Sequence, residues 1–349
     1  MTHHYEKVLT PSAGLRLHLN ENTSGCAPGV IEALRGITCH QAAFYPDYSD
    51  AITAAARFLR VDERQLVLTN GLDEGILAGS VAALRGSGED TPFEAIVIVP
   101  AFDMYAACAD AAGGRVIEIP VAEDFSFPLQ RVLDGVNRRT RIVFITNPNN
   151  PTGRSVPREA ILAIADAAPH ALIFVDEAYA DFSGTTLIGD AVLETRPHVL
   201  IGRTFAKAHG LAGLRVGALI GAAETLARVR RVIPPYSLNI AAAVALPAAL
   251  ADTRHYDDYL RQVAKSKRLL YSAFDRLAVE YWPSEANFVL ARFSEAATPV
   301  VAELQKRGVY VRDRSRDTGC AGCVRITAGI IEHTRQCIGA IEEVLCGAR

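Results

Sequence analysis

The chain has 349 residues, of which 50% are hydrophobic and 21% charged, and its formal net charge at pH 7 is -3. This is the composition of an ordinary folded protein of about two domains, and it offers no basic surface for nucleic acid or for an anionic membrane. The start of the chain lacks an export signal, and the longest apolar run, at residues 240–251, is too short to span a bilayer. We therefore expect a cytoplasmic protein with neither nucleic-acid nor membrane partners.

The cysteines suggest a reduced compartment, because there are seven of them and they are scattered along the chain. The one CxxC pair, Cys320 and Cys323, has no second pair of ligands nearby to complete a zinc site. A redox CxxC usually opens a helix, whereas Cys323 leads into a strand-like stretch. We expect neither a metal site nor a redox site.

An ordered N-terminal arm is expected before the first strand of the main sheet. Residues 17–19 alternate apolar and polar side chains, residues 20–28 are rich in turn formers, and Pro28 can open a helix over residues 29–35. Tyr45 occupies a further turn, where its ring has either a packing role or a ligand contact.

Strands and helices alternate from about residue 65 to residue 221. Apolar stretches predict strands at residues 65–69, 94–99, 115–120, 141–146, 171–175, 199–204 and 214–221. Helical patterns follow the first, second and fourth of these and end near residues 84, 112 and 168. This order predicts one mostly parallel sheet covered by helices. Neither GxGxxG after a strand nor GxxxxGK[ST] occurs, so we expect no dinucleotide or nucleoside-triphosphate site.

The first two strands end in residues suited to a ligand. Gly71, Leu72 and Asp73 open a helix, whose free backbone N–H groups and dipole favour an anion. Asp73 has a second interpretation as an acid that stabilises the first helical turn. Phe102 follows the strand at residues 94–99, where it either stacks on a flat ring or packs in the core.

Two further strand ends carry polar side chains. Asn147 and Asn150 each precede a proline, and the two Asn-Pro steps fix a rigid turn with amide donors on it. Asp176 directly follows the strand at residues 171–175, at the edge where open α/β sheets bind ligands. An aspartate that caps a helix is the alternative for that position.

Lys207 lies among small and apolar residues. Burial there would hold its amine neutral, and a neutral amine can form a Schiff base with an aldehyde. Thr204 and Arg215 on the same segment suit a phosphate. An aldehyde and a phosphate together suggest pyridoxal phosphate, whereas the alternative is a surface lysine beside a glycine-rich turn.

A second, smaller α+β domain is predicted after about residue 253. It contains a long amphipathic helix to residue 277, strands at 287–292, 309–312 and 324–327, and helices at 297–307 and 332–345. Arg325 lies inside an apolar strand and needs an anion, either a substrate carboxylate or an internal Asp or Glu. We divide the chain into an N-terminal arm with part of the small domain (residues 1–38), a large cofactor-binding domain (39–250) and a small domain (251–349).

Eight motifs in this order resemble fold-type I pyridoxal-phosphate aminotransferases of class I/II, and most closely histidinol-phosphate aminotransferases. The resemblance runs from Leu19 to the C-terminus and implies an α/β fold with a large, mostly parallel sheet domain and a smaller α+β domain. The motifs are Leu19-Asn20-Glu21-Asn22, Tyr45-Pro46-Asp47, Asn147-Pro148-Asn149-Asn150-Pro151-Thr152-Gly153, Asp176-Glu177-Ala178-Tyr179, Arg203-Thr204-Phe205-Ala206-Lys207, Gly213-Leu214-Arg215-Val216-Gly217, Ala286-Asn287-Phe288 and Cys323-Val324-Arg325-Ile326-Thr327.

The resemblance implies roles around the cofactor ring. Lys207 would form the Schiff base and carry the proton between the substrate's Cα and the cofactor's C4′, and Asp176 would pair with the pyridine nitrogen. Tyr179 and Asn150 would hydrogen-bond the ring's phenolic oxygen. Phe102 would stack on the ring, with Tyr105 as second choice. The phosphate would be held by the segment Gly71, Leu72 and Asp73, by Thr204 and by Arg215.

The resemblance also implies substrate and partner contacts. Tyr45 of the partner subunit would reach the cofactor's phosphate, so a homodimer is expected. Arg325 would bind a substrate carboxylate, with Arg312 and Asn22 as further substrate contacts. The expected reaction moves an amino group between a donor, histidinol phosphate or an amino acid, and a 2-oxo acid. Alternatives are an aminotransferase for aromatic or other amino acids, a decarboxylase or lyase with the same cofactor, and a regulatory module that senses pyridoxal phosphate.

Overall fold

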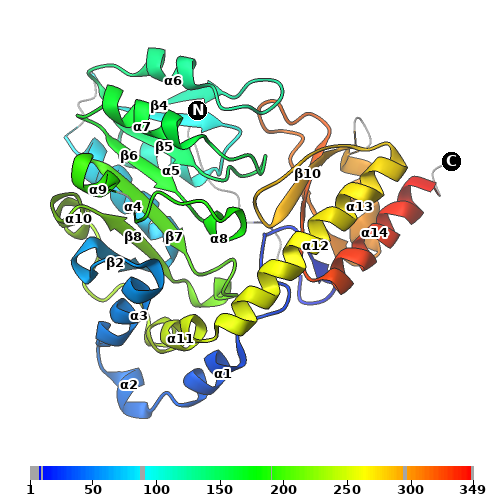
Figure 1. Cartoon of the computed structure of the whole chain (residues 1–349), viewed down its shortest axis with the longest axis horizontal. Helices are drawn as coiled ribbons and strands as arrows, with labels where there is room; N and C mark the ends of the chain where they lie inside the picture. The colour runs from blue at the N-terminus through cyan, green and yellow to red at the C-terminus, as the bar shows by residue number, and fades with distance from the viewer. Residues whose placement is uncertain (1–7, 9–10, 87–90, 190, 294–296, 347–349) are drawn as a thin grey trace.

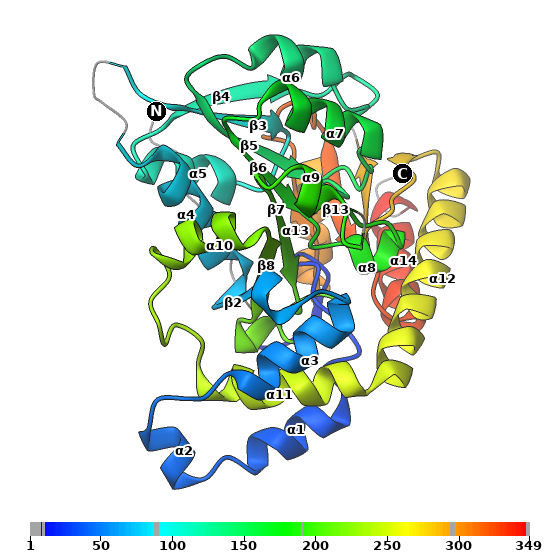
Figure 2. The ribbon, with the colours of Figure 1, turned by 60° about the vertical axis from the view of Figure 1, so that its left-hand side comes forward.

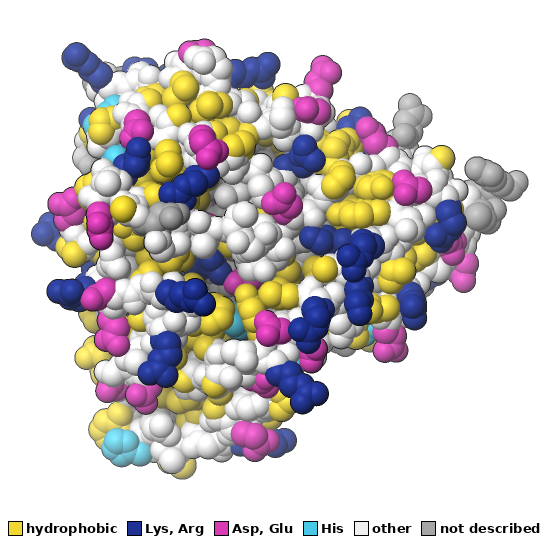
Figure 3. Space-filling model, in the orientation of Figure 1, with side chains coloured by type: hydrophobic (Ala, Val, Ile, Leu, Met, Phe, Trp, Pro, Cys, Tyr) yellow, Lys and Arg dark blue, Asp and Glu magenta, His cyan; other side chains and the backbone are white. Residues whose placement is uncertain are grey.

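The chain folds around a seven-stranded sheet and a four-stranded sheet that lie side by side (Figure 1). The structure is a computed structural model that describes residue 8 and residues 11–86, 91–189, 191–293 and 297–346. A long helix, α12 (Thr253–Leu277), runs from the base of the larger body along the smaller one. On the face that Figure 3 shows, acidic and basic side chains occur on both bodies.

The larger sheet has the strand order β2-β8-β7-β6-β5-β3-β4, and only β8 runs against its neighbours. The mostly parallel sheet predicted from the sequence is therefore confirmed. Its strands are β2 (Leu66–Thr69), β3 (Glu94–Val99), β4 (Arg115–Pro120), β5 (Thr140–Thr146), β6 (Leu172–Asp176), β7 (Val199–Thr204) and β8 (Gly217–Gly221).

Helices cover both faces of this sheet (Figure 2) because its strands are apolar on both sides. Side chains that alternate along the central strands divide between two buried clusters; Phe144 and Phe174, for example, belong to one and Val143 and Ile173 to the other. The first face is covered by α4 (Gly71–Leu84), α5 (Met104–Ala111) and α10 (Ala223–Arg230). The second is covered by α7 (Arg158–Ala167), with the shorter α6 (Leu129–Gly135) and α9 (Val192–Thr195).

Four helices form the base of the larger body: α1 (Pro28–Arg35), α2 (Cys39–Ala43), α3 (Ser49–Leu59) and α11 (Ile240–Ala251). Pro28 is the first residue of α1, as expected from its fixed φ and its missing N–H. Helices α2 and α3 were not predicted. The remaining short elements are α8 (Ala180–Ser183) and the 3-10 turns η1 (Glu63–Gln65) and η2 (Ala212–Leu214). None of the helices in the described part of the chain is long and apolar enough to cross a membrane.

The smaller body has its own buried core, formed by α12, α13 (Ala297–Lys306), α14 (Ile331–Cys346) and a four-stranded sheet. The sheet order is β12-β13-β10-β9, with β9 (Glu280–Trp282), β10 (Phe288–Arg292), β12 (Arg312–Asp313) and β13 (Cys323–Thr327). Leu15 and Leu17 of the N-terminal arm belong to the same core. Cys320 and Cys323 are free thiols, and Cys323 begins a strand as expected.

The single strand predicted at residues 309–312 is wrong, because the chain changes sheet at Val311. Residues Val309–Tyr310 (β11) pair in parallel with Leu15–Arg16 (β1), whereas Arg312 pairs with Arg325 in β13. Strand β11 pairs with an arm that lies almost 300 positions earlier in the chain. A local sequence pattern therefore cannot predict this pairing.

We predict that Gly217→Ala destabilises the larger body. A Cβ on Gly217 would lie 2.9 Å from the backbone nitrogen of Leu72 and 3.0 Å from the carbonyl carbon of Gly71, and backbone cannot move aside as a side chain does. We expect a loss of about 1–3 kcal/mol, measured as a lower midpoint of thermal or urea unfolding.

The matched control is Gly339→Ala in α14, where an added Cβ meets nothing within 4 Å. Because alanine favours helix over glycine, this change should be neutral or stabilise by up to about 1 kcal/mol. Equal unfolding midpoints for the two variants would contradict the close approach at Gly217.

Candidate active site

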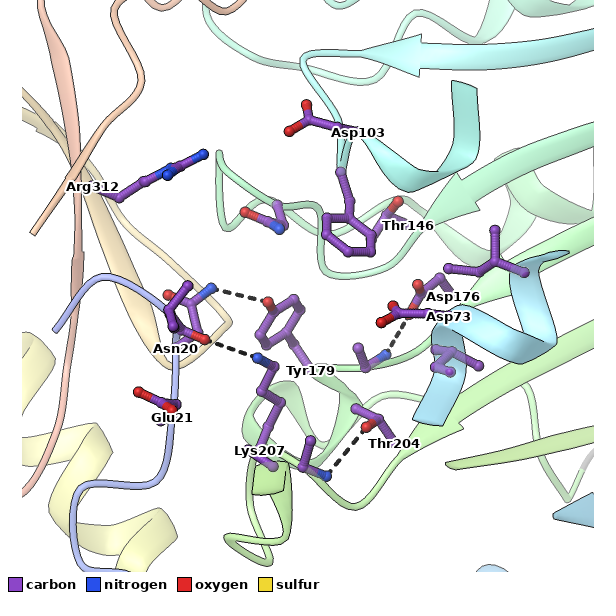
Figure 4. A pocket seen from close by; sticks show the side chains of 18 of the residues that line it. Asn20, Glu21, Asp73, Asp103, Thr146, Asp176, Tyr179, Thr204, Lys207 and Arg312 are labelled. Carbon is purple, nitrogen blue, oxygen red and sulfur yellow. Dashed lines mark hydrogen bonds between the residues drawn. The ribbon is translucent and has the colours of Figure 1, made fainter. Parts of the chain in front are cut away.

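The largest set of predicted site residues surrounds one cavity of about 350 Å³ between the two bodies (Figure 4). Thr146, Asp176 and Thr204 reach it from the carboxyl ends of β5, β6 and β7. The N-terminal arm contributes a second wall and the smaller body a third. The cavity therefore lies where an open, mostly parallel sheet is expected to bind a ligand.

Lys207 projects into this cavity from the turn after β7. Its Nζ donates a hydrogen bond of 2.9 Å to the carbonyl oxygen of Leu19. Burial and, after it, the nearby Arg325 together lower the pKa of this amine to about 8. A minor fraction of the amine is then deprotonated near neutral pH, and this is the form that attacks an aldehyde.

Asp176 is the last residue of β6 and is held from two sides. Its Oδ2 accepts a hydrogen bond of 2.7 Å from the hydroxyl of Tyr105, and its Oδ1 accepts one of 2.9 Å from the backbone N–H of Ala178. Burial nevertheless raises the pKa of the carboxyl to about 6, and these hydrogen bonds oppose the increase. Such a carboxylate is suited to a cationic or N–H partner on a bound ring.

Tyr179 and Asn150 both line the cavity, and each has one polar group already engaged. The Tyr179 hydroxyl accepts a hydrogen bond of 2.9 Å from Asn20 Nδ2. Asn150 Oδ1 accepts one from Arg325 Nη1, which leaves its amide nitrogen for a ligand. Burial raises the pKa of Tyr179, so its phenol stays protonated.

The start of α4 forms an anion cradle with Arg215. Leu72 and Asp73 line the cavity, and Arg215 Nη2 pairs with Asp73 Oδ2 at 2.7 Å. Gly71 has φ +72, and a Cβ there would lie 2.6 Å from Arg215 Nη2, so only glycine leaves room for the guanidinium. Thr204 also faces the cavity. Asp73 is an acidic residue in the first turn of α4, and it also lines the cavity beside Arg215.

Of the two aromatic candidates for ring stacking, the geometry favours Phe102. Tyr105 is 1% exposed, its ring packs nearly parallel to that of Phe144 with centroids 5.0 Å apart, and its hydroxyl is bonded to Asp176. Phe102 lines the cavity and meets Tyr105 edge to face at 5.8 Å. Tyr105 therefore supports Asp176 from behind, whereas Phe102 is the aromatic residue that the geometry favours for contact with a ligand.

Three arginines of the smaller body line the third wall, and they differ in charge compensation. Arg314 forms an ion pair with Asp317. Arg325 is 6% exposed and donates only to Asn150 Oδ1 and, at 2.6 Å, to the carbonyl oxygen of His18. No Asp or Glu among the described residues forms an ion pair with Arg325 or Arg312, which favours a substrate carboxylate over an internal one as the partner of Arg325. Burial lowers the pKa of Arg325 to about 10.

Three predicted site residues do not line this cavity, namely Gly71, which lies against the Arg215 guanidinium, Asn22 and Tyr45. The expectation of a substrate contact from Asn22 is corrected, since its Nδ2 donates to the carbonyl oxygen of Ala208 at 2.9 Å and its Oδ1 accepts from Ser24. Tyr45 is 78% exposed and stacks on Tyr236, with centroids 4.3 Å apart, outside the cavity of its own chain.

Sequence reasoning missed several residues that do line the cavity, chiefly Asn20, Glu21, Thr146 and Arg314. Asn20 has φ +55, a left-handed conformation that turns its side chain into the cavity. The cluster of turn formers at residues 20–28 was the available signal, because Asn tolerates this conformation better than most residues.

The residues present fit pyridoxal phosphate. Lys207 supplies a partly deprotonated amine for the aldehyde, and Asp176 supplies a buried carboxylate for the pyridine nitrogen. The cradle of Gly71, Leu72 and Asp73 with Arg215 offers N–H groups and a guanidinium to the phosphate. Within the described residues no group of three or more His, Cys, Asp or Glu side chains is placed to hold a metal ion.

Comparison with known proteins agrees with this chemistry. The family model for aminotransferase class I and II matches residues 13–341. Histidinol-phosphate aminotransferase 2 of Ralstonia nicotianae is 34% identical and covers 96% of this chain and 89% of its own. The histidinol-phosphate aminotransferase of Methanococcoides burtonii is 31% identical and covers 96% of this chain and 91% of its own.

A solved structure extends the likeness to three dimensions. The histidinol-phosphate aminotransferase of Sinorhizobium meliloti, in complex with pyridoxal-5'-phosphate, has a TM-score of 0.85 and 25% identity, and the match covers 97% of this chain and 92% of that one. The fold class, aminotransferase activity and cofactor predicted from the sequence motifs are thereby confirmed. The chain belongs to the aminotransferase class I and II family and is a pyridoxal-phosphate-dependent aminotransferase of fold type I.

Proposed function

We propose that the amino donor of this aminotransferase is histidinol phosphate and that the acceptor is a 2-oxo acid. The observation that carries the proposal is the pair Arg312 and Arg325, two cavity arginines that no carboxylate of the described residues neutralises. A substrate with a phosphate dianion supplies the missing charge. The curated relatives from Ralstonia and Methanococcoides, which the chain matches over most of its length, bear that substrate in their names.

The same two arginines suit the second half-reaction. A 2-oxo acid brings at least one carboxylate to the site that the phosphorylated donor has left, and a planar guanidinium binds carboxylate and phosphate in the same two-pronged way. One cationic wall is therefore sufficient for two chemically different substrates that bind in turn. An aromatic amino-acid donor remains the second candidate, because its carboxylate would engage Arg325 and leave Arg312 unpaired.

The chain's own residues divide the work. Bound pyridoxal phosphate supplies an electron sink for the substrate's carbanion. Lys207 Nζ would remove and return the proton at the amino-bearing carbon, and Asp176 would keep the pyridine nitrogen protonated. Asn150 and Tyr179 would orient the ring through its phenolic oxygen. Gly71, Leu72, Asp73, Thr204 and Arg215 would hold the phosphate, and Phe102 would cover the ring.

We also propose a cytoplasmic homodimer in which Tyr45 of the partner subunit completes the phosphate site. Supporting this, large apolar side chains are exposed near the base helices, among them Phe44, Tyr45 and Tyr236. Such exposed clusters are typical of a protein–protein contact. For the domains we propose the division 1–38, 39–250 and 251–349. The pairing of the arm strand β1 with β11 of the smaller body supports it, whereas α1, within residues 1–38, packs on α11 of the larger body.

The first prediction concerns Lys207. Cofactor capture by cofactor-free protein should speed up as the pH rises through about 8, because burial lowers the Lys207 pKa to about 8 and only the deprotonated amine attacks. After borohydride reduction, mass spectrometry should find the cofactor on the Lys207 peptide, and Lys207→Ala should carry none.

Lys267→Ala is a matched control, since burial also lowers the Lys267 pKa to about 8 but its Nζ donates to the carbonyl oxygen of Ser284, outside the cavity. This variant should capture the cofactor as the wild type does. Cofactor found on Lys267 instead of Lys207 would overturn the central role of Lys207.

The second prediction concerns the donor. Histidinol phosphate should convert the bound cofactor in a single turnover, and Arg312→Ala should lower kcat/KM for it by about 10–100-fold, the cost of one charge-assisted hydrogen bond. With unphosphorylated histidinol the same substitution should have little effect. Arg316→Ala, at an exposed arginine in the loop that follows β12, is the control. If glutamate or an aromatic amino acid reacts and histidinol phosphate does not, the donor proposed here is wrong while the transaminase chemistry stands.

The third prediction concerns the dimer. Tyr45→Phe removes only the hydroxyl, so sedimentation should still show a dimer while the dissociation constant of the cofactor rises by about tenfold. Tyr236→Phe removes the hydroxyl from the ring that stacks on Tyr45 and serves as the control. The cofactor affinity of this variant should be unchanged. A monomeric wild-type protein that binds the cofactor tightly would exclude a contribution from the partner's Tyr45.

A further inference from the structure

The turn Leu19–Asn20 lies against the two residues proposed to act on the cofactor. Lys207 Nζ donates to the carbonyl oxygen of Leu19 at 2.9 Å, and Asn20 Nδ2 donates to the Tyr179 hydroxyl at 2.9 Å (Figure 4). Lys207 and Tyr179 come from the larger sheet, whereas Leu19 and Asn20 come from the N-terminal arm. The arm is therefore part of the reacting centre.

The smaller body fixes which way the Asn20 amide faces. The Thr327 hydroxyl donates to Asn20 Oδ1 at 3.2 Å and accepts from the Asn20 backbone N–H at 3.1 Å. The Asn20 carbonyl oxygen accepts from Asn287 Nδ2 at 3.1 Å. Because the amide oxygen is occupied by a hydroxyl donor, the amide nitrogen is the group left to face Tyr179.

Asn20 is held in a conformation that most residues avoid. Its φ is +55 and its side chain is 1% exposed. A left-handed backbone costs about 1–2 kcal/mol for residues other than glycine, with Asn and Asp the most tolerant. Four hydrogen bonds of the buried Asn20 offset that cost, and together they aim the side chain at the cavity.

The hydrogen bond from Asn20 affects where the Tyr179 hydroxyl can donate its own proton. A phenol has one proton to donate, and Asn20 Nδ2 occupies one of its acceptor positions. Among the described residues, no acceptor takes the Tyr179 proton, although this hydroxyl is buried and lines the cavity. The proton is thus available to a ligand atom.

We propose that Asn20 is a positioning residue that fixes the Tyr179 hydroxyl as a hydrogen-bond donor toward the bound cofactor. This rests on the role proposed above for Tyr179. By donating to the phenol oxygen, Asn20 prevents Tyr179 from turning its own proton toward the arm. Thr327 and Asn287 hold Asn20 in place, so the donor geometry of Tyr179 depends on the arm being seated on the smaller body.

The measurement is the pH titration of the visible absorbance of the lysine-linked cofactor. A hydrogen bond from Tyr179 draws charge from the cofactor's phenolic oxygen, so the neighbouring nitrogen of Lys207 holds its proton less tightly. When that donation weakens, the pKa of the titration rises. Asn20→Gly keeps the left-handed backbone without strain and removes only the side chain, so we expect a rise of about half a pH unit to one unit.

Asn20→Asp is the second variant, because aspartate also tolerates the left-handed backbone but replaces the donor with a carboxylate oxygen. Tyr179 would then donate to Asp, away from the cofactor, and the pKa should rise by more than in Asn20→Gly. Ser24→Ala changes an exposed position of the same arm outside the cavity and should leave this pKa unchanged. Thermal unfolding of the cofactor-free variants separates loss of fold from loss of positioning.

The double variant Asn20→Gly/Tyr179→Phe tests whether Asn20 acts through Tyr179. If it does, the double variant should titrate like Tyr179→Phe alone. An Asn20→Gly variant with the wild-type pKa, or one that shifts the pKa equally with and without the Tyr179 hydroxyl, would overturn the proposal. If the proposed function itself were wrong, the wild type would show no absorbance of a lysine-linked cofactor to titrate. That result is distinct from the two results that would overturn the role of Asn20.

Discussion

Buried charge that has no ion-pair partner among the described residues is the constraint on which this site depends. Lys207, Asp176 and Arg325 are each enclosed, and burial shifts every one toward its neutral form, with pKa values of about 8, 6 and 10 respectively. Removing ions from water is costly unless each finds a partner. Their amine, carboxylate and guanidinium suit the aldehyde, ring nitrogen and anionic groups that cofactor and substrate would bring.

One wall of the cavity is formed by the larger sheet, and the others are formed by the N-terminal arm and the smaller body. Asp176 and Thr204 extend from strands that are paired on both sides within the larger sheet, so their positions are fixed by the ladder itself. Leu19, Asn20 and Arg325 approach from the arm and the smaller body. The residues proposed to bind the cofactor are therefore held by the larger sheet. The residues proposed to bind the substrate depend on how the arm and the smaller body pack against that sheet.

The sequence predicted the larger sheet and the residues at its strand ends well, and it predicted the arm and the smaller body less well. Apolar runs place the strands of the main sheet within a few residues of their true ends, because burial on both faces leaves a strong local pattern. The residues that follow those strands, such as Asp176 and Lys207, were found for the same reason. By contrast, β11 and β12 were merged, and Asn22 was chosen where Asn20 reaches the cavity. Both errors arise from contacts with distant segments and from a left-handed backbone, neither of which has a periodic signature.

That division also explains why the cofactor was easier to infer than the donor. The groups that meet pyridoxal phosphate occupy strand ends and a helix start, where residue type and position are both tightly constrained. The candidates for substrate recognition, Arg312 and Arg325, lie on two short strands of the smaller body that pair with each other. A change in the loop between those strands can move one guanidinium relative to the other without disturbing the larger sheet. On the function proposed above, substrate preference would thus depend on how the smaller body presents Arg312 and Arg325, and the chemistry of the cofactor would not restrict it.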